Sequence, residues 1–192
     1  MLPRFVSIFD RHMKTVHTWK VSMLRAVYDI LTILIYAGED LHPFANQPSL
    51  RLLIDHLLRL LNQPVLISKV HPNSNNNETL VLDGTLIVLT NLVRQPDTLN
   101  YIKQGKPAGI FRQLTSVSHD EIVRNSYTML AYTANDDDDL KRVQKDLPQL
   151  LTTIIDALKK DMATRDQLDR SGRALLNQNV VHLLQTLRGN RS

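Results

Sequence analysis

The sequence contains no cysteine, and this absence excludes several kinds of chemistry at once. Without thiol groups the chain cannot form disulfide bonds, thiolate zinc sites, iron–sulfur clusters or a cysteine nucleophile. A protein without disulfide bonds fits a reducing compartment. We therefore expect a cytoplasmic protein, with the nucleus as the alternative location.

Glycine and long hydrophobic runs are also scarce. The six glycines are isolated, so there is no glycine-rich loop that would cradle a phosphate group. The longest uncharged apolar stretch, residues 30–38, is far shorter than the roughly 20 residues that cross a bilayer. Arg4, Asp10 and Arg11 interrupt the first apolar residues, which is unlike a signal peptide. We therefore expect no association with membranes.

Positive charge is not concentrated anywhere along the chain. There are 23 Lys and Arg residues against 19 Asp and Glu residues, which gives a formal net charge of +4. The closest basic groups, at residues 141–145 and 159–160, have acidic neighbours. Nucleic-acid-binding proteins usually gather their basic residues on one face. This pattern disfavours nucleic acid as a partner.

Helical periodicity, in contrast, is present over almost the whole length. With 192 residues, 43% of them hydrophobic, the chain is long enough to bury a core in a single domain. Apolar residues recur at helical spacing and predict helices at about 5–20, 24–35, 48–61, 79–94, 97–104, 107–117, 119–134, 137–146, 148–160 and 165–188. No alternating pattern predicts a strand, and only residues 65–67 are left open between strand and helix. The sequence therefore predicts an all-α fold.

Several residue types mark where these helices begin and end. Gly38 is placed to end the helix before it, and Pro48 suits the first turn of the next helix. Ser118 and Glu121 have the spacing of a capping box, in which each side chain satisfies a free backbone N–H group. Asp97 is a candidate N-cap for the helix that follows Pro96.

A repeat of 41 residues joins three of the predicted helices to the three that follow. Pro107 and Pro148 are 41 positions apart, and so are apolar pairs on either side of them. These pairs include Val81 and Ile122, Leu82 and Val123, Leu86 and Tyr127, Leu89 and Leu130, Leu99 and Leu140, and Leu114 and Ile155. We expect Leu89 and Leu130 to be buried between repeats. A period near 40–47 residues with two or three helices per unit is typical of HEAT and armadillo arrays.

Residues 96–136 resemble one armadillo repeat, with a short helix, a second helix that opens near Gly105 and Pro107, and a long third helix. The preceding third helix contains Val-Leu-Thr-Asn-Leu-Val at residues 88–93. This segment is similar to the Ala-Leu-Ser-Asn-Ile-Ala signature of the armadillo family.

The resemblance is not complete. The next unit has Tyr132 at the position of the signature asparagine. The tryptophan that precedes this asparagine in nuclear-import adaptors is replaced by Ile87 in one unit and Thr128 in the next.

The resemblance implies a right-handed α-solenoid of about three armadillo-like repeats with irregular terminal helices. The chain, 1–192, would then be a single armadillo-like helical domain. Its parts are a degenerate N-terminal unit at 20–62, an asparagine-rich insertion at 63–78, the best-matching repeats at 79–160 and a C-terminal capping helix at 161–192.

The asparagine-rich insertion follows from the proline spacing. Pro48 lies 59 positions before Pro107, which is about 18 more than the 41-residue period. Residues 71–77 within it are polar and rich in helix breakers. We expect this loop to be mobile and to tolerate shortening, because the free energy of loop closure depends weakly on loop length.

The third helices of armadillo proteins line a concave groove, and the resemblance implies that this groove binds a partner. Its signature asparagine bonds the backbone of an extended peptide, and this role transfers to Asn91. Tyr132 is a candidate aromatic anchor, and arginines of the groove are candidates for binding acidic residues. The complete candidate set is Asn91, Arg94, Arg124, Thr128, Tyr132 and Arg173.

No set of residues passes the spacing tests for catalysis or metal binding. Ser118, His119 and Asp120 are neighbours in sequence, whereas a catalytic triad is assembled from residues that meet in space. The aspartates at 136–139 lack the central glycine and the final glutamate of an EF-hand loop. The seven histidines do not pair at metal-ligand spacing. We therefore expect no enzymatic activity, no cofactor and no metal ion.

The resemblance thus implies a non-catalytic scaffold that binds a protein or an extended peptide along the groove. One alternative is a regulatory armadillo array of an enzyme complex, for example one with a TIR-type NAD-cleaving domain. Nucleic-acid binding through the basic surplus is a third, weaker alternative. The identity of the partner and the oligomeric state stay open, because a fold does not determine its partner.

Overall fold

The computed structural model of this chain describes residues 20–72 and 74–133, and the single positions Arg4, Ser7, Arg11, Lys141 and Lys145. The described part contains seven α-helices, one 3-10 helix and no strand, which confirms the predicted all-α class. None of its helices is long and apolar enough to cross a membrane. The helices predicted at 137–146, 148–160 and 165–188 lie outside the described residues, as does most of the one at 5–20.

The helices follow one another with short connections. In chain order they are α2 (Val21–Ala37), the 3-10 helix η2 (Gly38–Phe44), α3 (Pro48–Leu61), α4 (Pro64–Ile67), α5 (Asn77–Leu92), α6 (Pro96–Gln104), α7 (Ala108–Leu114) and α8 (Asp120–Thr133). The predicted helices within residues 24–134 all exist at about the expected places. The sequence pattern did not predict η2, and residues 65–67, which were left open, belong to the helical turn α4.

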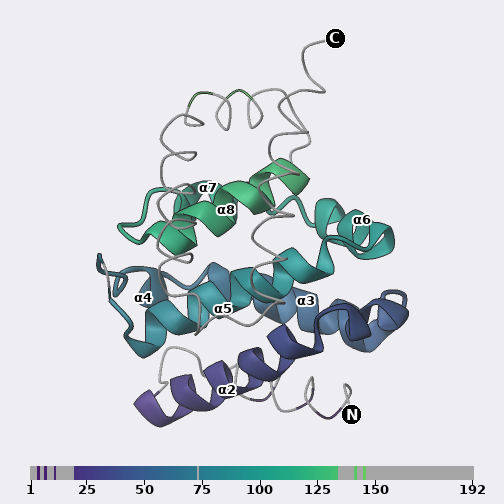
Figure 1. The fold of residues 1–192 in the computed structure, drawn as a ribbon, viewed down its shortest axis with the longest axis horizontal. Coiled ribbons are helices and arrows are strands. Elements are labelled where there is room, and N and C mark those ends of the chain that lie inside the picture. Colours follow the sequence, from purple (N-terminus) through teal and green to yellow (C-terminus); the bar gives the residue numbers. More distant parts are fainter. Residues whose placement is uncertain are drawn as a thin grey trace, which may run out of the picture.

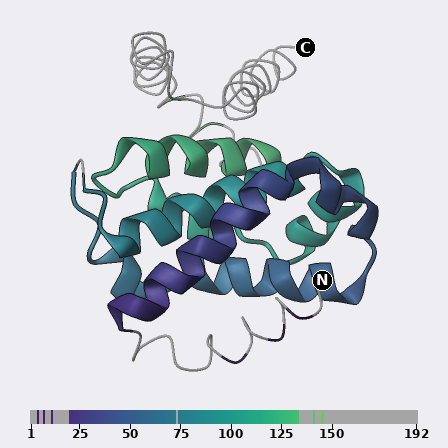
Figure 2. The ribbon, with the colours of Figure 1, turned by 60° about the horizontal axis from the view of Figure 1, so that its bottom comes forward.

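Helices α2, α5 and α8 lie side by side, with α5 in the middle (Figure 1). The other helices pack against this row, α3 and α4 against α5, and α6 and α7 against α8. In the turned view, α3 runs along the lower edge and α8 along the upper edge (Figure 2). The central α5 is therefore surrounded by neighbours, which explains why most of its residues are buried.

The core is a single cluster of aliphatic side chains to which the described helices contribute. Leu89 and Leu130, which the repeat predicts to be buried, are both 0% exposed. Gly84 marks the closest approach of α5 to α2, because a Cβ atom there would lie 3.5 Å from the Leu31 side chain. Burial of these leucines supplies the main favourable free energy of folding.

Three predicted helix starts are confirmed or corrected by the helix bounds and hydrogen bonds. Pro48 occupies the first turn of α3, as expected. The capping box at Ser118 is wrong, because α8 begins at Asp120 and the first helical carbonyl is that of His119, which accepts from Val123 N at 3.0 Å. Asp97 is not an N-cap either, since α6 begins one residue earlier and its N-cap residue is Gln95.

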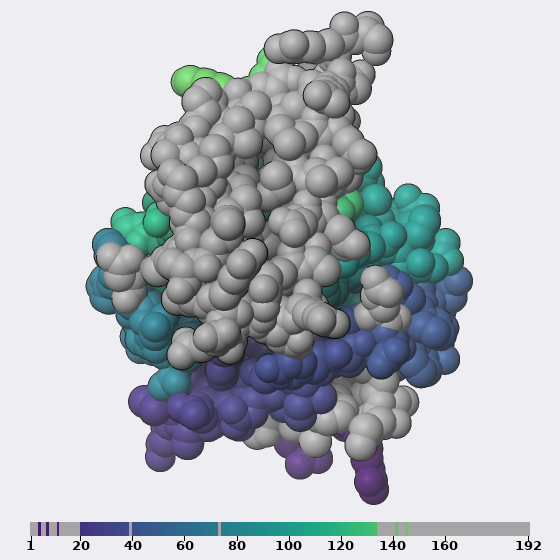
Figure 3. All heavy atoms as spheres, viewed as in Figure 1, coloured from purple at the N-terminus to yellow at the C-terminus, as the bar shows by residue number. Residues whose placement is uncertain are grey.

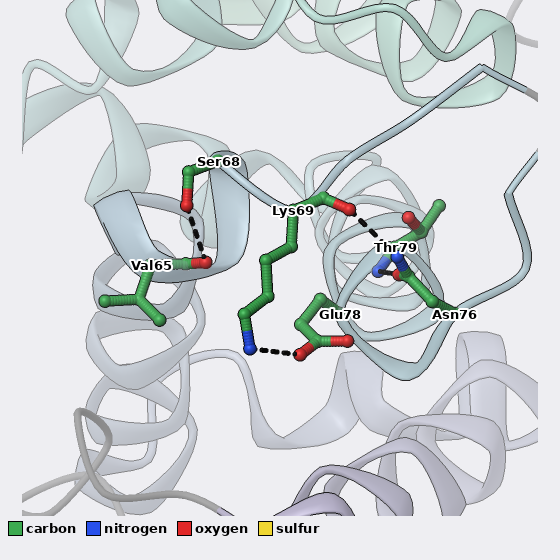
Figure 4. Close-up of polar contacts among 6 residues, drawn as sticks. All are labelled: Val65, Ser68, Lys69, Asn76, Glu78 and Thr79. Atoms are coloured by element: carbon green, nitrogen blue, oxygen red, sulfur yellow. Dashed lines mark hydrogen bonds and ion pairs between the residues drawn. The ribbon is translucent and has the colours of Figure 1, made fainter.

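The expectation of a loosely attached loop at 71–77 is wrong at its C-terminal end. Asn76 is the N-cap of α5, and its Oδ1 atom accepts a hydrogen bond from Thr79 N at 2.8 Å. The Asn76 side-chain nitrogen also donates to the carbonyl of Lys69 at 2.8 Å, and Lys69 Nζ lies 2.8 Å from Glu78 Oε1 (Figure 4). These bonds tie the two ends of the loop together and to the first turn of α5.

Candidate partner-binding surface

One side of α5 is less buried than the rest of the helix. Its members are Leu80, Asp83, Ile87, Asn91 and, just beyond the helix end, Arg94. Their spacings of three and four residues place them on one face of the helix. We call this set the α5 stripe.

The residues of α8 at the 41-residue offset form the corresponding set, Glu121, Arg124, Thr128 and Tyr132, which we call the α8 stripe. The two stripes are in contact at both ends. Asp83 interacts electrostatically with Arg124 near one end, and Arg94 with Tyr132 near the other. The structure therefore places Arg124 near Asp83 and Tyr132 near Arg94, and Asn91 precedes Arg94 by three residues in the α5 stripe.

Asn91 lies deep in this surface. It is only 8% exposed, and its side-chain amide makes no hydrogen bond among the described residues. Its backbone carbonyl oxygen lies 3.4 Å from Nε2 of His42, a residue of η2. A side-chain amide at this position can still donate to and accept from a ligand that reaches the surface.

Tyr132 lies close to Asn91 in the register of the two stripes. Its side chain is half-buried, and this burial raises the pKa of the phenol, while the positive charge of Arg94 acts in the opposite direction. The ring thus offers an apolar face with a neutral hydroxyl group at ordinary pH. Such residues are common at the centres of protein interfaces.

The other end of the surface is a polar cluster around Asp83. Burial raises the pKa of Asp83, while the charge of Arg124 and the hydrogen bond from Asn125 Nδ2, at 2.9 Å, act against that rise. Glu121 raises this pKa further and His119 lowers it. Arg124 therefore has a carboxyl group of the protein itself nearby, and a ligand carboxylate would compete with Asp83 for it.

One of the candidate residues does not take the expected place. Thr128 is 1% exposed, and its hydroxyl group donates to the carbonyl of Arg124 at 3.1 Å. The Thr128 hydroxyl group is therefore hydrogen-bonded within its own helix, as is common for threonine in a helix. Arg173 lies outside the described residues.

Sequence reasoning missed two neighbours of the site, His42 and Asn125. Asn125 carries a weak signal, because it follows the 41-residue counterpart of Asp83 by one position. His42 carries none, since η2 has no periodic pattern and the contact spans 49 residues. Both were found only through the packing of separate helices.

The described residues contain no group of three His, Asp or Glu side chains that would hold a metal ion. His119 is 8% exposed, and its Nδ1 atom lies 3.5 Å from Glu121 Oε2. Ser118 is exposed at the surface beside it.

No protein-family model, curated protein or solved structure matches the chain.

Proposed function

We propose that this protein is a non-catalytic interaction module of the armadillo type, which binds an extended segment of a partner protein along the α5 and α8 stripes. In this proposal α2, α5 and α8 are the third helices of successive units, and η2, α3, α4, α6 and α7 are the helices between them. The support is the side-by-side order of these three helices and the 41-residue offset between the two stripes.

The observation that carries the proposal is the Asn91 side-chain amide. It is nine-tenths buried, it has no hydrogen-bond partner among the described residues, and it lies in the same surface as Arg94 and Tyr132. An amide can donate to one backbone carbonyl and accept from one backbone N–H group. The chemistry of an extended peptide backbone matches this capacity, whichever side chains it carries.

The selectivity of the surface follows from its charges. Asp83 and Arg124 interact with each other near one end. Arg94 and Tyr132 lie at the other end, where they would favour an acidic or hydroxyl-bearing residue next to an apolar one. The ligand we propose is therefore a peptide with mixed apolar and acidic character rather than a strongly acidic one.

The test is a selection of random peptides, displayed on phage, against the immobilised full chain. Selected peptides are then measured for affinity against the wild type, Asn91→Leu and Tyr132→Ala. Asn91→Leu keeps a similar side-chain volume and removes the amide. Asn100→Ala, at an exposed position of α6, is the matched control for a lost asparagine.

We expect Asn91→Leu to weaken binding about fivefold and Tyr132→Ala about thirtyfold, while Asn100→Ala binds like the wild type. Circular dichroism and the melting temperature of each variant show whether it is folded. If the selected peptides bind all folded variants with equal affinity, the α5 and α8 stripes are not the binding surface. The same follows if only substitutions on α3 and α6 weaken binding.

A further inference from the structure

The outer face of α2 is unusually apolar for an exposed helix surface. Val21, Ile33 and Tyr36 are 68%, 53% and 73% exposed, and they are most of the large hydrophobic side chains exposed on the described residues. The opposite face of α2 packs on α5 through Leu24 and Leu31. In the space-filling view, α2 forms the lower band of coloured atoms (Figure 3).

The exposed residues of α2 follow the spacing of a coiled-coil seam. Ser22, Ala26, Asp29, Ile33 and Tyr36 are separated by four, three, four and three residues, and each of them is exposed. Such a seam lies along one side of a helix and packs on a second helix at a small crossing angle. The side chains Ser22 and Ala26 in the N-terminal half of the seam are small, and Ile33 and Tyr36 in the C-terminal half are large. Two antiparallel copies would therefore place Ile33 of one copy near the small residues of the other.

The charges beside this seam are complementary to themselves. Arg25 and Asp29 lie one turn apart, 3.9 Å from each other, and their side chains are 70% and 66% exposed. A two-fold axis that passes near Val27 brings Arg25 of each copy opposite Asp29 of the other. The same axis brings Ile33 within one residue of the position opposite Ser22, so charge and size favour nearly the same register.

We propose that the outer face of α2 binds a second copy of this chain, with the two α2 helices antiparallel and centred near Val27. The helix is about 26 Å long, which limits the area that it can bury. Interfaces at the low end of the size range are usually weak. The proposed dimer therefore has a dissociation constant on the order of micromolar, and it forms and dissociates readily.

The test is sedimentation velocity of the full chain from about 1 to about 200 µM, a range that spans micromolar affinity. The wild type is expected to shift from monomer to dimer over this range. Ile33→Arg is expected to stay monomeric, because it places two cations in the seam. Val65→Arg is the matched control, since Val65 is 47% exposed on α4, and it is expected to dimerise like the wild type.

Charge reversal separates a contact between copies from the contact within one helix. Arg25→Asp alone and Asp29→Arg alone each place like charges opposite one another, and each is expected to raise the dissociation constant at least about tenfold. An equimolar mixture of these two variants restores both opposite-charge contacts between the copies. It is expected to dimerise about as well as the wild type.

Circular dichroism shows whether each variant is folded. A wild type that stays monomeric up to about 200 µM overturns the proposal and leaves this face to another occupant. The proposal is also overturned if the wild type dimerises and Ile33→Arg dimerises equally well. It is overturned too if the mixture of Arg25→Asp and Asp29→Arg dimerises as weakly as each variant alone. The test does not depend on peptide binding, so its result is independent of the proposed function.

Discussion

Gly38 has a backbone conformation that other residues seldom adopt, with φ of 44° and ψ of −116°. It follows the last residue of α2, and its N–H group donates to the carbonyl of Leu34. A Cβ atom at Gly38 would have nothing within 4 Å. Any cost of adding a side chain here therefore comes from the backbone and not from crowding.

We expect Gly38→Ala to destabilise the fold by about 1–3 kcal/mol, because alanine is strained in this region of φ and ψ. Gly109→Ala is the matched control, since a Cβ at this position also meets nothing within 4 Å and the glycine lies within α7 without a positive φ. That change should stabilise the protein by up to about 1 kcal/mol. Urea denaturation measures both, and equal effects of the two substitutions would contradict this account of Gly38.

Two carboxylates near α5 respond to their surroundings in opposite directions. Burial raises the pKa of Asp83 above its usual 3.8, more than Arg124 and Asn125 lower it. Burial also acts to raise the pKa of Glu78, but the hydrogen bond and the charge of Lys69, with the backbone N–H of Glu78, lower it below 4.5 overall. The two groups therefore contribute to stability with opposite dependence on pH.

For Asp83, the folded protein keeps a proton that the unfolded chain loses above about pH 3.8. The contribution of Asp83 to stability is therefore lost as the pH rises from the pKa of the unfolded chain to the raised pKa of the folded protein. For Glu78, the unfolded chain keeps its proton to higher pH, so the contribution is present above about pH 4.5 and is lost as the pH falls.

We expect these signs in urea denaturation between about pH 4 and about pH 7. The stability of the wild type relative to Asp83→Asn should fall as the pH rises, whereas its stability relative to Glu78→Gln should rise. If both differences in unfolding free energy, wild type minus Asp83→Asn and wild type minus Glu78→Gln, change with pH in the same direction, one of the two environments is wrongly described.

At the scale of elements, the start of α5 depends on Asn76. This residue caps the helix through Thr79 N and holds the carbonyl of Lys69, so one side chain joins the loop to the helix. We expect Asn76→Ala to cost about 1–2 kcal/mol, the loss of an N-cap together with a second hydrogen bond. Asn75→Ala is the matched control, because Asn75 is exposed and makes no hydrogen bond among the described residues.

Thermal or urea denaturation measures the two asparagine variants side by side. A difference of less than about 0.5 kcal/mol between them would mean that the loop is attached as weakly as its composition suggests.

The sequence pattern predicted some elements well and others poorly, for physical reasons. Helices such as α3 and α8 show apolar residues at helical spacing because one face of each packs on the core. The helix η2 shows no such period, because its turns are short and Pro43 lies inside it. The predicted start of α8 was one residue early, because Ser118 and Glu121 fit the capping spacing while the chain places His119 at the cap.

The candidate surface was predicted in part for a similar reason. The 41-residue offset was sufficient to pair Asp83 with Arg124, whereas Tyr132 interacts with Arg94, three residues beyond its counterpart Asn91. It carried no information on burial, which is why Thr128 was taken as a surface residue although it is 1% exposed. Contacts such as that of His42 arise only when distant helices pack together.

At the scale of the whole molecule, the segment before residue 93 and the segment after it are joined by packing and by dispersed polar contacts. Three hydrogen-bonded pairs span the boundary, Asn46 with Asp97 at 2.9 Å, Asp55 with Tyr101 at 3.0 Å, and Asp83 with Asn125 at 2.9 Å. They lie at separate places, two of them on α6 and the third between α5 and α8, so they fix the orientation of the two segments rather than a single point. Leucines between α5, α7 and α8 fill the space between them.

We expect Leu130→Ala, at a position 0% exposed, to destabilise the whole described fold by about 2–5 kcal/mol. Leu52→Ala is the matched control, since Leu52 is 41% exposed on α3, and should cost less than about 1 kcal/mol. Urea denaturation followed by circular dichroism compares them. An unchanged midpoint for Leu130→Ala would show that α5 and α8 are not joined through this residue.

The central claim, that a partner peptide bonds Asn91 between the two stripes, is tested most directly by nuclear magnetic resonance. The protein is labelled with ¹⁵N and titrated with a peptide obtained from the display selection, and the side-chain amide signal of Asn91 is followed, with its assignment confirmed by Asn91→Leu. We expect this signal to shift among the largest of all, together with backbone signals of residues 83–94 and 121–132. Shifts confined to α3, α6 or the outer face of α2, with the Asn91 side-chain signal unchanged at saturation, would contradict the claim.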